Sequence, residues 1–94
     1  MNQAQIKALI LDHLKAYHPI SVGIFGSYAR GENKISSDID ILVKFKKALS
    51  LLTVIKLENE LSEALGIKVD LVTSGAIKNK RIKKSIQKDL ISIL

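Results

Sequence analysis

The sequence of 94 residues contains no cysteine and no tryptophan, a single proline, and only four aromatic residues in all. Without cysteine the chain can form neither disulfides nor thiolate metal sites, and a reducing compartment suits it. The scarcity of aromatic rings disfavours nucleic-acid binding by base stacking. No apolar run approaches the ~18 residues that span a bilayer, and the N-terminus lacks the pattern of a signal peptide. We therefore expect a cytoplasmic protein without a membrane segment.

Aliphatic side chains and positive charge are what the chain has in abundance. Hydrophobic residues make up 47% of it, mostly Ile, Leu and Val, which is typical of helices packed on a sheet. Fifteen Lys and Arg against nine Asp and Glu give a net charge of +6. This excess favours either simple solubility or an anionic partner such as a nucleotide, RNA or an acidic protein. At this length we expect one small domain spanning residues 1–94.

Hydrophobic periodicity predicts alternating helices and strands. We expect helices over 3–16, 49–66 and 76–87, a helical turn around 28–30, strands over 20–25, 38–45 and 67–73, and a short strand within 89–94. Each main strand has one aliphatic face, namely Ile20, Val22 and Ile24, then Ile39, Ile41 and Val43, then Ile67, Val69 and Leu71. The long helix carries a stripe of Leu51, Val54, Leu57, Leu61 and Leu65, interpreted as core. The fold class is α/β (α+β), with strand order and the direction of pairing left open.

Aspartates occupy the other face of two predicted strands. Asp38 and Asp40 are two residues apart, so their side chains project from one face, about 6.5 to 7 Å apart. Asp70 lies in the middle of the third strand, opposite its aliphatic neighbours. If these strands are neighbours, three carboxylates converge, and unit charges about 4 Å apart repel by roughly 4 kcal/mol at an effective dielectric of 20. Such a cluster must hold protons or bind cations, and oxygen ligands favour Mg²⁺ or Mn²⁺.

Gly26 and Ser27 form a turn, and ten residues lie between this turn and Asp38. A glycine lets the backbone approach a ligand closely, and N–H groups at a helix start point at anions. Ser27 adds a hydroxyl donor, and Arg30 either reaches a phosphate or lies in solvent. The turn is not a P-loop, because no Gly-Lys-Ser/Thr follows it. Together with the carboxylates it suits phosphoryl or nucleotidyl transfer with two divalent ions.

The stretch GSYARGENKISSDIDILV resembles the signature of the polymerase-β-like nucleotidyltransferase superfamily, specifically its minimal nucleotidyltransferase (MNT) branch. The family pattern is Gly-Ser, ten residues, then Asp-x-Asp, usually elaborated as GSxARG…SDxDLxV. The matching residues are Gly26, Ser27, Ala29, Arg30, Gly31, Ser37, Asp38, Asp40 and Val43. Ile41 stands where leucine is common. The segment GIKVDLVT is similar to the family's third-carboxylate strand, which places that role on Asp70.

This resemblance implies a nucleotidyltransferase fold, a small mixed sheet of three to four strands with helices packed mainly on one face. It also implies Mg²⁺-dependent transfer of a nucleoside monophosphate from a nucleoside triphosphate, here AMP from ATP. By analogy Asp38 and Asp40 bind two Mg²⁺ ions, for which Mn²⁺ could substitute. Asp70 completes one metal site and accepts the proton of the acceptor hydroxyl. The residues implied to bind the nucleotide are Gly26, Ser27, Arg30 and Ser37.

The resemblance further implies a protein partner. Small proteins of this branch are commonly encoded with a HEPN-domain toxin and act as antitoxins by adding AMP to a toxin tyrosine. We therefore expect a HEPN-domain toxin as partner, a homo- or hetero-oligomer, and no nucleic acid as direct substrate. Two alternatives stay open. The protein could neutralise a partner by complex formation alone, or bind nucleic acid through the basic segment 77–88, which is otherwise a solvated helix face.

Overall fold

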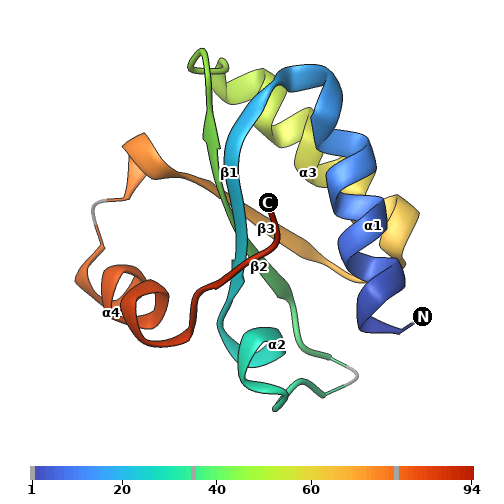
Figure 1. The fold of residues 1–94 in the computed structure, drawn as a ribbon, viewed down its shortest axis with the longest axis vertical. Helices are drawn as coiled ribbons and strands as arrows, with labels where there is room; N and C mark the ends of the chain where they lie inside the picture. The colour runs from blue at the N-terminus through green and yellow to red at the C-terminus, as the bar shows by residue number, and fades with distance from the viewer. Residues whose placement is uncertain (1, 35, 78) are drawn as a thin grey trace.

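The protein is described by a computed structural model that covers residues 2–34, 36–77 and 79–94. Its elements are α1 (Gln3–Leu14), a 3-10 turn (Lys15–Tyr17), β1 (Pro19–Phe25), α2 (Ser27–Arg30), β2 (Ile39–Phe45), α3 (Leu51–Leu65), β3 (Val69–Thr73), a second 3-10 turn (Ser74–Ala76), α4 (Lys80–Asp89) and β4 (Ile91–Ser92). The predicted order of helices and strands is confirmed, and Figure 1 shows their arrangement.

The four strands form one mixed sheet in the order β3-β2-β1-β4. β1 pairs antiparallel with β2 and with β4, whereas β2 and β3 are parallel. The third strand is thus the neighbour of the second, which the sequence had left open. A parallel pair needs a crossover connection, and α3 supplies it here.

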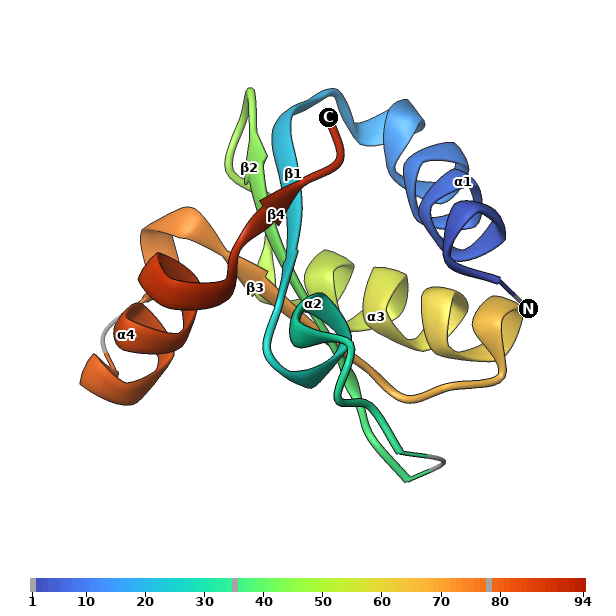
Figure 2. The ribbon, with the colours of Figure 1, turned by 60° about the horizontal axis from the view of Figure 1, so that its bottom comes forward.

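Helices cover the two faces of the sheet unequally. α1 and α3 lie together over one face, and α4 lies on the opposite side (Figures 1 and 2). The core cluster lies under α1 and α3 and consists of Ile6, Ile10, Leu14, Val22, Ile24, Ile39, Ile41, Val43, Phe45, Leu57, Leu61, Leu65, Val69 and Leu71. In the described part of the chain, no helix is both long enough and apolar enough to cross a membrane.

The face opposite this core is only partly covered. Leu90, which follows α4, packs over Gly23 of β1, where a Cβ would collide with the leucine side chain. The lack of a side chain at Gly23 therefore lets the C-terminal segment lie against the sheet. Farther along the sheet, Asp40 and Asp70 stay half-buried on this face. A partly open polar surface remains beside a well-packed core.

Several predicted boundaries and faces are wrong in detail. Asp38 directly precedes β2 instead of belonging to it, and α4 begins at Lys80, not at residue 76. Ile20 is 55% exposed because the register between β1 and β2 is irregular at this point. Leu51 is 74% exposed because it begins α3 one turn before Val54, the first residue of the helix to pack against the core.

Candidate active site

Two aspartates meet where β2 and β3 run side by side. The strands are parallel and in register, so Asp40 is paired with Asp70 across the ladder. The preceding pair, Ile39 and Val69, is buried in the core. Because side chains alternate along a strand, the pairing that fills the core also presents both carboxylates on the opposite face. The predicted convergence is therefore seen directly for Asp40 and Asp70.

Asp38 lies at the edge of this pair, one residue before β2. Its Oδ2 is 3.9 Å from Nζ of Lys68, and its negative charge raises the pKa of Asp40. In the loop that precedes Asp38, the hydroxyl oxygen of Ser37 accepts a hydrogen bond from the backbone N–H of Lys34 at 2.7 Å. Among residues 2–34, 36–77 and 79–94, no three acidic or histidine side chains form a ready metal cluster. The charges of Asp38 and Asp70 therefore act on Asp40, although the three carboxylates do not form a compact ligand cluster among the described residues.

Asp40 has an unusual protonation equilibrium, because its pKa is raised from 3.8 to about 6. Burial is the largest cause, since it penalises the charged form. The charges of Asp70 and Asp38 add to the rise, as does a hydrogen bond with Asp70, while the positive charge of Arg30 opposes it. The site thus carries a surplus of negative charge that a bound cation would relieve.

The turn between β1 and α2 brings the backbone directly against Asp40. Gly26 has φ 77°, a conformation that residues with a side chain rarely adopt. A Cβ at this position would also collide with Oδ2 of Asp40. Two independent constraints therefore require glycine here. They place Gly26 directly against the carboxylate of Asp40, and Ser27 follows it as the first residue of α2.

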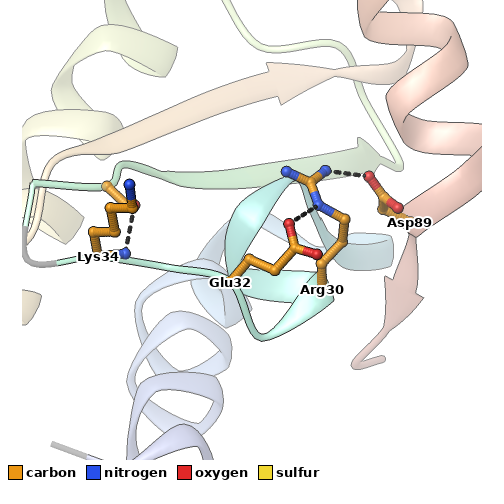
Figure 3. A network of polar contacts seen from close by, with 5 residues as sticks. Arg30, Glu32, Lys34 and Asp89 are labelled. Atoms are coloured by element: carbon orange, nitrogen blue, oxygen red, sulfur yellow. Dashed lines mark hydrogen bonds and ion pairs between the residues drawn. The ribbon is translucent and has the colours of Figure 1, made fainter.

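Arg30, the last residue of α2, is held by two carboxylates (Figure 3). Its Nη1 donates a hydrogen bond to Oδ2 of Asp89 at 2.6 Å, and its Nε donates one to Oε2 of Glu32 at 3.1 Å. These contacts raise the pKa of Arg30 further above its ordinary value. Sequence reasoning missed Asp89 altogether. Its one sequence signal is that it ends an otherwise basic helix.

The basic segment forms the solvated face of α4, as the simpler interpretation predicted. The exposed residues are Lys80, Arg81, Lys83, Lys84 and Lys88, and Ile82 and Ile86 are half-buried. Lys78, which belongs to the same segment, lies outside the described residues. The helix therefore turns its isoleucines toward the protein and most of its charge toward solvent.

The chain belongs to the nucleotidyltransferase domain family, whose model matches residues 7–93. It is 51% identical over 94 residues to "Putative protein adenylyltransferase MJ1217" of Methanocaldococcus jannaschii, with 96% of each chain covered. It is 44% identical over 72 residues to "Protein adenylyltransferase MntA" of Thermococcus cleftensis, which covers 77% of this chain and 72% of that protein. The predicted family and the enzyme class, nucleotidyltransferase, are thereby confirmed.

Solved structures with a similar fold agree with the predicted architecture. A "Structure of putative minimal nucleotidyltransferase" has a TM-score of 0.75 and 31% identity, with 95% of this chain and 89% of that chain covered. A chain of the structure of a "tri-AMPylated Shewanella oneidensis HEPN toxin in complex with MNT antitoxin" has a TM-score of 0.80 and 22% identity. That match covers 99% of this chain and 72% of the other. The predicted fold, a small mixed sheet with flanking helices, is confirmed.

Proposed function

We propose that the protein is a Mg²⁺-dependent protein adenylyltransferase that transfers AMP from ATP to a hydroxyl of a partner protein. The partner is a HEPN-domain toxin, which the enzyme neutralises as its antitoxin in a hetero-oligomeric complex. The observation that carries the proposal is the pairing of Asp40 with Asp70 beside the turn at Gly26. The names of the adenylyltransferase relatives and the AMPylated toxin bound to a protein of this fold support the transferred group and the partner.

The donor set at this site fits a hard divalent cation. All three carboxylates offer oxygen ligands. Burial first, and then the charges of Asp70 and Asp38, raise the pKa of Asp40, and a bound cation would favour its charged form. Asp38 and Asp40 would hold two Mg²⁺ ions, or Mn²⁺ in their place, and Asp70 would complete one of the two sites. When bound, such ions neutralise charge on the attacking and leaving oxygens.

The chain's own residues position the nucleotide and move a proton. The backbone at Gly26 and the hydroxyl of Ser27 hold the β- and γ-phosphates, and Arg30 and Ser37 contribute further donors. The acceptor hydroxyl oxygen attacks the α-phosphorus, the bond to the bridging oxygen breaks, and pyrophosphate leaves. The hydroxyl proton passes to the carboxylate of Asp70. A cytoplasmic location would supply the ATP.

The test is transfer of label from α-labelled ATP to the cognate toxin in the presence of Mg²⁺. We expect labelled toxin with the wild-type protein and none with the double variant Asp38→Ala, Asp40→Ala. The matched control is Asp12→Ala, which removes an exposed carboxylate on α1 and should leave transfer intact. Absence of transfer by the wild type, or equal transfer by the double variant, would overturn the proposal. Full protection from the toxin by an inactive double variant would establish the binding module instead.

A further inference from the structure

The last residue of α4 differs in charge from the rest of that helix. Asp89 is the only acid among its ten residues, five of which are Lys or Arg. A carboxylate is unfavourable at a helix C-terminus, where the dipole carries partial negative charge. The side chain of Asp89 is nevertheless only 5% exposed, whereas the basic residues of α4 lie in solvent. Helix formation therefore does not explain why an acidic side chain is buried at this position, and we look for the explanation in a tertiary contact.

That contact is with Arg30, which lies 59 positions earlier in the chain. Asp89 Oδ2 accepts the Nη1 hydrogen bond at 2.6 Å, and the two residues join α4 to α2 (Figure 3). The second partner of the guanidinium, Glu32, is 68% exposed and lies only two residues away in sequence. Burial strengthens a charge-assisted hydrogen bond, and exposure weakens it. Asp89 is therefore the principal anchor of the guanidinium.

The helix that carries the anchored guanidinium begins at the candidate active site. The backbone N–H of Arg30 donates a hydrogen bond to the carbonyl oxygen of Gly26 at 3.2 Å, and Gly26 lies directly against Asp40. An arginine has five N–H donors, and the contacts found within the described residues engage one on Nε and one on Nη1. The guanidinium can therefore stay fixed by carboxylates and still donate to an anion bound beside Asp40.

We infer that Asp89 is a positioning residue, which holds Arg30 so that its remaining donors meet the triphosphate of ATP; this rests on the proposed function. A free arginine side chain loses considerable rotamer entropy when a ligand immobilises it. The contact with Asp89 shifts that loss to folding, before the nucleotide arrives. Asp89 thereby links the position of the C-terminal helix to the affinity of the site for ATP.

Steady-state kinetics of Asp89→Asn test this inference, because the variant keeps the size of the side chain and removes its charge. We expect the KM for ATP to rise about tenfold, as for other residues that orient a ligand-binding group, with a much smaller change in kcat. A merely structural role would reduce the amount of folded enzyme and lower the apparent kcat at unchanged KM. Asp12→Asn, which removes the carboxylate of an exposed ion pair with Lys15, is the matched control and should behave as wild type.

Calorimetric titration of ATP with Mg²⁺ into the protein alone separates this inference from the proposed function. We expect Asp89→Asn to bind ATP about tenfold more weakly than the wild type. If the wild type binds no ATP, the proposed function falls and this inference with it. If both bind equally, only the inference is overturned. Tighter binding by Asp89→Asn would also overturn it, because Asp89 would then compete with the nucleotide for Arg30.

Asp89→Glu keeps the experiment decisive if the Asn variant does not fold. It retains the ion pair but lengthens it by one methylene group, which displaces the guanidinium. Positioning therefore predicts a KM for ATP above that of the wild type, with little change in kcat. A wild-type KM in Asp89→Glu would contradict the inference, since only the presence of the charge would then matter.

Discussion

Replacing Asp40 by Asn should stabilise the protein at neutral pH while it removes catalysis. The substitution keeps the size of the side chain but removes a negative charge from beside Asp70 and Asp38. Because the pKa of Asp40 is raised from 3.8 to about 6, the folded protein binds this proton more tightly than the unfolded chain does. The contribution of Asp40 to wild-type stability is therefore fully present below pH 3.8, is lost as the pH rises from 3.8 to about 6, and is absent above.

The size of the gain follows from the same pKa. A rise from 3.8 to about 6 corresponds, at about 1.36 kcal/mol per pKa unit, to an upper limit of about 3 kcal/mol. Asp40 is only half-buried, so solvent screens part of the repulsion. Asparagine also replaces only part of the hydrogen bonding of a protonated carboxyl. We therefore expect Asp40→Asn to be more stable by roughly 1 to 1.5 kcal/mol at about pH 7.5.

Urea unfolding in EDTA, followed from about pH 4.5 to about pH 7.5, measures this gain. The difference in the free energy of unfolding between variant and wild type should increase as the pH rises. Asp12→Asn on the exposed face of α1 is the control, and its difference from the wild type should not increase with pH. A wild type that is as stable as Asp40→Asn at the upper pH would refute the reasoning. Millimolar Mg²⁺ in place of EDTA should narrow the difference, because a bound cation neutralises the wild-type site.

Two further pairs of variants test the turn and the core, both by urea unfolding. Gly26→Ala should abolish AMP transfer and cost more stability than Gly31→Ala, because both have positive φ but only Gly26 lies against Asp40. The strain common to both is worth about 1 to 3 kcal/mol, and equal losses would contradict the close approach. Leu57→Ala should cost about 2 to 5 kcal/mol, since Leu57 is fully buried in α3. Leu52→Ala, 80% exposed on the same helix, should cost less than about 0.5 kcal/mol; similar losses would contradict this placement of the core.

Local periodicity was sufficient to predict the elements and most of the core. Leu57, Leu61 and Leu65 are buried because they share one face of a helix, which spacing alone reveals. The same reasoning was wrong for Leu51 and Ile20, which follow the pattern and are exposed. Periodicity shows which residues share a face of a helix or strand. It does not show where the element that packs on that face ends, or where an irregular strand pairing shifts the register.

The candidate site was predictable only in part, for a related reason. Alternation along the strands placed Asp40 and Asp70 opposite the core, but their pairing depends on strand order, which a helical crossover leaves undetermined. The contact of Gly26 with Asp40 and that of Asp89 with Arg30 both join distant parts of the chain. No local pattern specifies such contacts, because they follow from the completed sheet and from the docking of α4.

The ladder between β2 and β3 also restricts how this sequence can vary. Ile39 pairs with Val69 and Asp40 with Asp70 in consecutive steps. A slip of one residue would turn the apolar side chains outward and the carboxylates into the core. An insertion or deletion within either strand would therefore damage stability and chemistry together. The loops flanking α3 can change length at small entropic cost, so we expect length variation among relatives to concentrate there.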